Sequence, residues 1–153
     1  MKITEILEPE AIVADMRATT KSDALEELAG VVAKRHPTID RERLVDVLHE
    51  REELGSTAIG EGIAIPHGKM PGLGNVVAVF GRSLKGVEFD SLDGGPTRLF
   101  FLLVAPEDSA GAHLKALARI SRLLKDRDFR TRLLEVQGPD ALFATIREED
   151  EKY

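Results

Sequence analysis

The stretch REELGSTAIGEGIAIPHGK, residues 51–69, leads from the end of a predicted helix through a glycine-rich segment to a histidine, His67. The apolar run Ile63–Ile65 predicts a short strand that places His67 at its end, where we expect a sharp turn. Two hydroxyl residues, Ser56 and Thr57, and four glycines surround the approach to His67: Gly55, Gly60, Gly62 and Gly68. Glycines allow tight turns and bring backbone N–H groups close to a ligand, which suits an anion site. The stretch therefore predicts that His67 can carry a phosphoryl group.

Two better-known glycine motifs do not fit the same stretch. The run Gly60–Gly62 leads into a strand rather than a helix, so it lacks the context of a dinucleotide fingerprint. Gly68 and Lys69 are followed by Met70 instead of Ser or Thr, and the spacing to the preceding glycine is one residue too long for a nucleotide P-loop. The chain also has no cysteine and no H-E-x-x-H pattern that could hold zinc. We predict no metal site and no cofactor.

Arg51 follows the apolar line of a helix that is predicted to span Asp40–Glu53. Leu44, Val47 and Leu48 form this line, and the helical spacing places the stem of Arg51 over the same buried face. One interpretation is an arginine that covers apolar surface with its aliphatic stem. The other is a guanidinium directed at an anion near the following glycine-rich loop.

The patterns along the rest of the chain predict helices on both sides of a buried sheet. A capping-box-like start at Thr20 predicts a helix that ends near His36. The other predicted elements are strands at Ile12–Met16, Val76–Gly81 and Leu99–Ala105, a polar loop with a short edge strand at Gly86–Pro96, and helices at Gly111–Lys125, Asp126–Val136 and Pro139–Arg147. Continuously apolar strands are typical of a sheet that is covered on both faces. We predict an α/β fold with a mixed central sheet flanked by helices, in a single three-layer α/β/α domain that spans residues 1–153.

The second candidate histidine, His113, falls in the first turn of the predicted helix Gly111–Lys125. Apolar residues follow it at i+4, i+7 and i+11, so its ring shares their buried stripe. His113 is therefore either packed at the edge of the core or placed beside His67, where free N–H groups of the helix start would add attraction for a dianion. His36 and His49 are interpreted as structural or surface residues.

The bulk properties are those of an ordinary globular domain. The 153 residues fit one domain, and 42% hydrophobic and 31% charged residues are typical proportions. A formal net charge of −6 without a basic stripe argues against nucleic acid as the main partner. No run approaches the ~20 apolar residues that a membrane span needs, and the start lacks the apolar core of a signal peptide. We expect a cytoplasmic protein without membrane insertion.

Residues 51–69 resemble the active-site segment of enzyme IIA domains of the bacterial phosphotransferase system, in the mannitol/fructose class (type 2). This class includes the nitrogen-related regulatory proteins. A second block, LFFLLVAPEDSAGAHLK at Leu99–Lys115, is similar to the same family. The resemblance extends more loosely from Ile3 to Ile146, and the sequence departs from it at Ala58, where the family often has glycine.

The resemblance implies a phosphotransferase component with a phosphohistidine intermediate. HPr or its nitrogen-branch counterpart, an NPr-like protein, would donate a phosphoryl group to His67. His113 and Arg51 would orient the reaction and stabilise the phosphoryl group. The further predicted phosphoryl-binding residues are Ser56, Thr57 and Gly68.

Three downstream functions stay open at this point. A transport component would pass the phosphoryl group to a separate EIIB domain for a fructose- or mannitol-type sugar, because no IIB or IIC module is recognised in the chain. A regulator would bind target proteins differently in its phosphorylated and free forms, since phosphorylation adds nearly two negative charges. A hydrolase that uses His67 and His113 is a third hypothesis, although no carboxylate-rich ligand set accompanies the pair.

Overall fold

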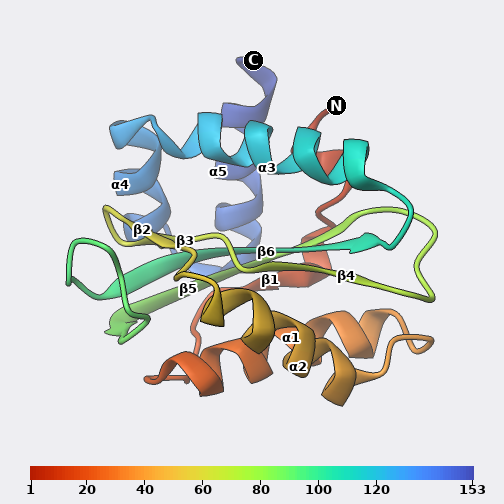
Figure 1. The fold of residues 1–153 in the computed structure, drawn as a ribbon. Coiled ribbons are helices and arrows are strands. Elements are labelled where there is room, and N and C mark those ends of the chain that lie inside the picture. Colours follow the sequence, from red (N-terminus) through yellow and green to blue (C-terminus); the bar gives the residue numbers. More distant parts are fainter.

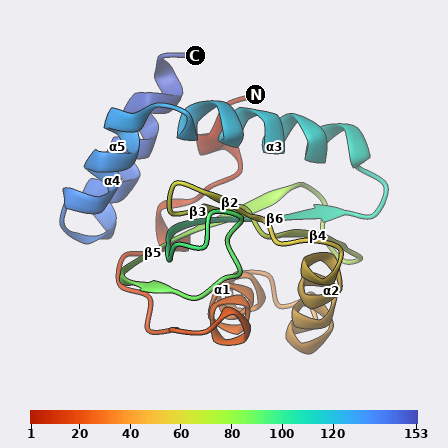
Figure 2. The same cartoon turned by 60° about the vertical axis from the view of Figure 1, so that its left-hand side comes forward.

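The computed structural model describes residues 1–153 and places a mixed six-stranded sheet between two layers of helices. Figure 1 and Figure 2 show α1 and α2 on one face of the sheet and α3, α4 and α5 on the other. The helices are α1 (Lys21–Arg35), α2 (Arg41–Glu53), α3 (Ala110–Leu124), α4 (Arg127–Glu135) and α5 (Gly138–Glu151), and two 3-10 turns lie at Ile3–Glu5 and Pro9–Ala11. The predicted three-layer α/β/α arrangement is confirmed.

The sheet is built around one buried strand, β6. The strands are β1 (Ile12–Val13), β2 (Ala58–Gly60), β3 (Ile63–Ala64), β4 (His67–Met70), β5 (Val77–Val87) and β6 (Thr97–Pro106). Their order is β1-β5-β6-β3-β2, with β4 also paired to β6. β5 and β6 are antiparallel, whereas β1 runs parallel to β5, and β3 and β4 run parallel to β6. The sheet is therefore mixed, as predicted.

β3 and β4 follow one another along the same side of β6, and this arrangement positions His67. β3 pairs with Leu99 and Phe100, whereas β4 pairs with the later residues Leu103–Pro106. Ile65 and Pro66 fill the interruption, where proline has no N–H to donate to a ladder. His67 thus begins a strand, and the predicted sharp turn after it is wrong.

The helix starts agree closely with their sequence signals. The Thr20 hydroxyl accepts a hydrogen bond from the Asp23 N–H at 3.2 Å, and Asp40 caps α2 by accepting from the Arg43 N–H at 3.3 Å. Such caps pair N–H groups that would otherwise lack a partner in the first turn. Ser109 occupies the N-cap position of α3, although its side chain makes no capping hydrogen bond.

The core is one cluster of buried apolar side chains on both faces of β5 and β6. Phe80 and Phe101 pack edge to face with ring centroids 5.0 Å apart, and Phe89 and Phe100 do so at 5.4 Å. Such pairs add specific geometry to the area that aromatic side chains bury. The continuously apolar run of β6 therefore marks the centre of the sheet, as its pattern predicted.

Several boundaries differ from the sequence predictions. β2 and β4 were not expected, and β5 continues to Val87 instead of ending at Gly81. In the predicted polar loop Gly86–Pro96, the first two residues belong to β5, and the remainder forms no strand but an isolated bridge between Thr20 and Glu88. Short strands such as β2 and β4 contain too few residues to show a clear alternation.

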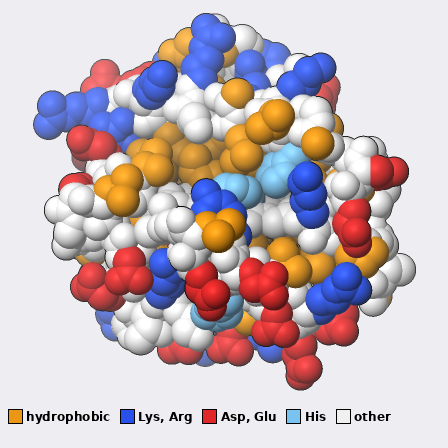
Figure 3. Space-filling model, in the orientation of Figure 1, with side chains coloured by type: hydrophobic (Ala, Val, Ile, Leu, Met, Phe, Trp, Pro, Cys, Tyr) orange, Lys and Arg blue, Asp and Glu red, His pale blue; other side chains and the backbone are white.

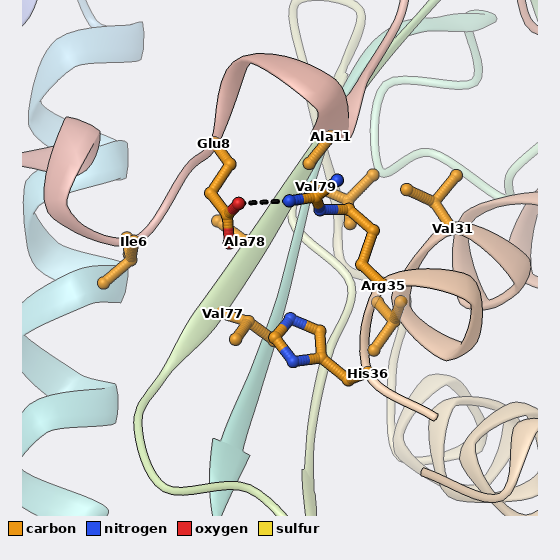
Figure 4. A pocket seen from close by; sticks show the side chains of 10 residues that line it. Ile6, Glu8, Ala11, Val31, Arg35, His36, Val77, Ala78 and Val79 are labelled. Carbon is orange, nitrogen blue, oxygen red and sulfur yellow. Dashed lines mark hydrogen bonds and ion pairs between the residues drawn. The ribbon is translucent and has the colours of Figure 1, made fainter. Parts of the chain in front are cut away.

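A small cavity lies between α1, β5 and the N-terminal 3-10 turns (Figure 4). Arg35 pairs with Glu8 across it, and His36 lies beside Val77. The cavity holds about 10 Å³, which is room for about one water molecule, so we interpret it as a packing feature. None of the helices combines the length and apolar character that crossing a membrane requires.

Candidate active site

His67 lies at the start of β4, on the face of the sheet that α3 covers. Along β4 the residues alternate, so that Gly68 and Met70 are buried while His67 is partly exposed and Lys69 is exposed. Gly68 faces α2, where a Cβ would lie 2.7 Å from Val47 Cγ1. The alternation therefore directs the His67 ring away from α2 and towards the N-terminal end of α3.

The two ring nitrogens of His67 have different partners. Nδ1 lies 2.9 Å from the carbonyl oxygen of Ile65, an acceptor, so Nδ1 carries the proton and donates it there. Nε2 accepts a hydrogen bond from Arg51 Nε–H at 3.2 Å, since a guanidinium only donates. This tautomer leaves the lone pair on Nε2, which makes Nε2 the nucleophilic atom of the ring.

Arg51 reaches His67 from the last turn of α2. Its Nη1 donates to the carbonyl oxygen of Gly55 at 3.0 Å, which fixes the guanidinium between the helix end and the glycine-rich loop. The structure therefore brings Arg51 to the candidate nucleophile, and it does so from the apolar face of α2, as the helical spacing indicated.

His113 lies beside His67 at the start of α3. The ring centroids are 5.3 Å apart and the planes meet at 74°. His113 is only 6% exposed, and its Nε2 is buried without a hydrogen-bond partner. Burial lowers the pKa of His113 most, and its proximity to the titratable groups of His67 and Lys69 lowers it further. The ring is thus kept neutral, with one polar atom free for a further partner.

Ser56 and Thr57 are engaged elsewhere. The Ser56 hydroxyl donates to the carbonyl oxygen of Phe89 at 2.8 Å, and the Thr57 hydroxyl donates to Glu52. The Thr57 N–H also donates to Glu52, at 3.0 Å. Neither residue lines the pocket at His67. Their hydroxyls therefore hold the glycine-rich loop against its surroundings in this structure, whereas the predicted Gly68 does line the pocket.

A pocket of about 370 Å³ opens over Arg51, His67 and His113. Its lining residues are Arg51, His67, Gly68, Lys69, Ala110, His113, Leu114 and Leu117. Figure 3 shows adjoining patches of pale blue histidine side chain near the middle of this face, with basic and hydrophobic side chains around them. Lys69 was missed at the sequence level, although its position two residues after His67 on one strand placed it on the same face. No three His, Cys, Asp or Glu side chains group in a way that could hold a metal ion.

The family described as the phosphoenolpyruvate-dependent sugar phosphotransferase system, EIIA 2, matches residues 5–149, and the chain belongs to this family. Members of the family act as phosphotransfer components.

Both regulatory and sugar-specific proteins are among its relatives. The chain is 44% identical over 147 residues to a nitrogen regulatory protein of Bradyrhizobium diazoefficiens, covering 95% of each chain. It is 39% identical over 150 residues to the fructose-specific EIIABC component of Bacillus subtilis, covering 98% of this chain and 24% of that protein. The crystal structure of the nitrogen regulatory protein IIA-Ntr from Neisseria meningitidis matches with a TM-score of 0.87 and 33% identity, over 94% of this chain and 98% of the other.

Proposed function

We propose that this chain is a phosphocarrier, in which His67 accepts a phosphoryl group from an HPr-like or NPr-like donor protein. The observation that carries the proposal is the state of the His67 ring, with Nδ1 bound to the Ile65 carbonyl and Nε2 directed at Arg51. A neutral imidazole with a fixed tautomer and one accessible lone pair is what nucleophilic attack on phosphorus requires.

The transfer step is a displacement between two histidines. The Nε2 lone pair of His67 attacks the phosphorus atom, and the bond from phosphorus to the donor's ring nitrogen breaks, with its electron pair returning to the donor ring. The His67 ring then carries a positive charge beside the new N–P bond. The Ile65 carbonyl oxygen accepts the Nδ1 hydrogen bond at 2.9 Å and stabilises that charge without taking the proton.

Three side chains line the space that the transferred group would occupy. Arg51 gives up its hydrogen bond to Nε2 when the N–P bond forms, and its Nε–H and Nη2 groups are then free for phosphoryl oxygens, while Nη1 stays bound to Gly55. The unpartnered Nε2 of His113 supplies a hydrogen bond, and Lys69 adds a positive charge at the rim. Groups placed in advance around developing charge are the main source of catalysis in such transfers.

The surface around the site suits protein donors better than small phosphate esters. Leu54 at the end of α2 is 84% exposed, and Leu114 in the first turns of α3 is 67% exposed. Leu117 lines the same pocket. An apolar rim around a polar centre is typical of a docking surface.

We favour a regulatory use of the phosphoryl group over delivery to a sugar-specific EIIB domain. The 44% identity to a nitrogen regulatory protein over 95% of both chains supports the first function. The 39% identity to a fructose-specific component supports the second. Phosphorylation at His67 places nearly two negative charges among exposed leucines, which changes which partners can dock.

The nucleophile is tested by labelling with a radioactive phosphoryl group from a phosphoenolpyruvate-driven donor system. We expect an acid-labile, base-stable phosphate on the wild-type chain and none on His67→Ala, because no other ring nitrogen faces the pocket with a fixed tautomer. His49→Ala, on the flank of α2, is the matched control and should label normally. Normal labelling of His67→Ala would contradict the assignment.

The two downstream functions are separated by adding a purified fructose-type EIIB domain to the labelled chain. Rapid loss of the label to that domain supports transport. Retention of the label supports regulation.

A further inference from the structure

A second pocket lies at the far end of the sheet from His67, where the start of β6 meets α4 and the turn between β2 and β3. Its volume is about 310 Å³. Three arginines line it: Arg98, Arg127 and Arg130. Only two of its eleven lining residues are hydrophobic, and this size is at the lower end for small-molecule sites. Three guanidinium groups around one polar hollow are notable in a chain with a net charge of −6.

The helix geometry brings the donors of α4 to one side. Arg127, Arg130 and Thr131 are spaced i, i+3 and i+4, so they share a face of the helix. Arg127 is exposed and has neither an ion-pair nor a hydrogen-bond partner, and the Thr131 hydroxyl has no hydrogen-bond partner either. These two side chains are therefore available to a ligand.

The other two arginines are held in place by the fold. Arg130 Nη1 donates to the carbonyl oxygen of Leu124 at 2.6 Å, and Arg98 Nε donates to the carbonyl oxygen of Leu84 at 3.3 Å. Each of these bonds uses one nitrogen, which leaves other guanidinium N–H groups for a ligand. Arginines whose position is fixed in advance lose less conformational freedom when they bind an oxyanion.

The two acidic residues of the pocket leave the three arginines with an excess of one positive charge. Asp93 accepts hydrogen bonds from the Ser91 hydroxyl and from the Gly95 and Glu61 N–H groups, at 2.7, 3.0 and 3.1 Å. These bonds, the one from Ser91 most of all, hold the pKa of Asp93 below its usual range. The carboxylate of Asp93 is thus bound to hydrogen-bond donors of its own loop and of the turn between β2 and β3. Glu61 is 76% exposed and lies 3.7 Å from Arg130 Nη2, a loose pair that a ligand can replace.

We propose that this arginine pocket binds a small doubly charged oxyanion, of the phosphate-ester or dicarboxylate class. Guanidinium groups present paired N–H donors that match both kinds of oxyanion. The pocket shares no lining residue with the one at His67. The carbonyl oxygen of Leu124, which binds Arg130, marks the position of the arginine pocket along α3. His113, at the other site, lies eleven residues earlier on this helix, or about 16 Å along its axis. A ligand in the arginine pocket therefore binds independently of the phosphoryl group on His67.

The test is a titration of the full chain followed by two-dimensional amide NMR, with inorganic phosphate and malonate as probes at constant ionic strength. We expect saturable shifts at Gly62, Gly95, Arg98 and Thr131, separate from any shifts at Gly68 and His113. Tighter binding of phosphate assigns the pocket to phosphate esters, and tighter binding of malonate assigns it to dicarboxylates. An absence of saturable shifts around the arginine pocket with both probes would overturn the proposal.

Two variants sharpen the result. Arg127→Gln should weaken binding about tenfold, because a hydrogen bond to a charged group is lost. Arg43→Gln, which removes an exposed arginine on α2, is the matched control and should leave the affinity unchanged. Because Arg127 makes no hydrogen bond or ion pair within the fold, its variant keeps the wild-type spectrum elsewhere. Equal binding by Arg127→Gln and the wild type would remove Arg127 from the site and contradict the proposal.

Discussion

The two histidines at the centre of the site have different surroundings although their rings are 5.3 Å apart. His67 has a hydrogen-bond partner on each ring nitrogen, which fixes its tautomer. His113 is buried, and its Nε2 has none. From this difference we infer that the first ring is the nucleophile and that the second ring supports the phosphoryl group.

The burial of His113 predicts a pH dependence of stability. In the folded chain the pKa of His113 is lowered, and burial is the largest cause. In the unfolded chain the pKa of a histidine is ~6.5. Below about pH 6.5 the unfolded state binds a proton at this residue before the folded state does, so the free energy of unfolding falls as the pH falls. Above about pH 7.5 neither state is protonated there, and the contribution vanishes.

When the pH is lowered from about 7.5 to about 5.5, the free energy of unfolding of His113→Gln should therefore fall by less than that of the wild type. Urea denaturation at both pH values measures the difference. His49→Gln is the control, and it should keep the wild-type pH dependence. An unchanged dependence in His113→Gln would show that the ring is protonated equally well in both states.

At the scale of single residues, the structure brings four of the six predicted site residues together. His67, His113, Arg51 and Gly68 all line one pocket. Ser56 and Thr57 lie next to this loop in sequence but bond to Phe89 and Glu52. The partners of a hydroxyl depend on how distant segments pack, and no local pattern of Ser and Thr reveals them.

At the scale of elements, the close approach of β4 to α2 determines where Arg51 meets His67. Gly68 allows this approach, because a Cβ there would lie 2.7 Å from Val47 Cγ1. Arg51 lies one helical turn after Val47 on the same helix. Any displacement of α2 therefore moves the guanidinium relative to the ring.

Gly68→Ala should slow phosphoryl transfer by about tenfold to hundredfold, although the substitution adds no charge and removes no donor. The reason is that the new methyl group pushes α2 outward, at a cost of about 1–3 kcal/mol in stability. The initial rate of labelling from the phosphorylated donor measures the effect. Gly111→Ala, in the first turn of α3 where a Cβ meets nothing within 4 Å, is the control. Equal rates for both variants would mean that the spacing between β4 and α2 does not control transfer.

The elements themselves were predictable to different degrees. The helices α1 and α2 begin within one residue of their predicted starts, since Thr20 and Asp40 cap them. β4 was not foreseen, because its partner β6 lies more than thirty residues further along the chain. Pairing over such a distance is decided by the tertiary fold rather than by local pattern.

At the scale of the whole molecule, Arg82 connects three parts of the fold. It is only 3% exposed on β5, and its Nε donates to the carbonyl oxygen of Ala14 at 3.1 Å. Its Nη1 donates to the carbonyl oxygens of Leu133 and Val136 at the end of α4. The guanidinium thereby joins the sheet to the segment after β1 and to α4, through one buried bond, to Leu133, and two part-buried ones.

Arg82→Met should lower the free energy of unfolding by about 2–4 kcal/mol, because buried carbonyl groups lose a charged donor. Thermal or urea denaturation measures this loss. Arg43→Met on the exposed side of α2 should stay within about 0.5 kcal/mol of the wild type. The labelling rate of folded Arg82→Met should remain close to that of the wild type, since Arg82 does not line the pocket at His67. A loss of stability no larger than in Arg43→Met would contradict the role assigned to Arg82.

The central claim is that Nε2 of His67 receives the phosphoryl group. Long-range proton–nitrogen NMR correlations of the phosphorylated, nitrogen-15-labelled chain identify the ring nitrogen that carries phosphorus. We predict phosphorus on Nε2 of His67, with Nδ1 still bearing its proton towards Ile65. Phosphorus on Nδ1, or on any other residue, would contradict it.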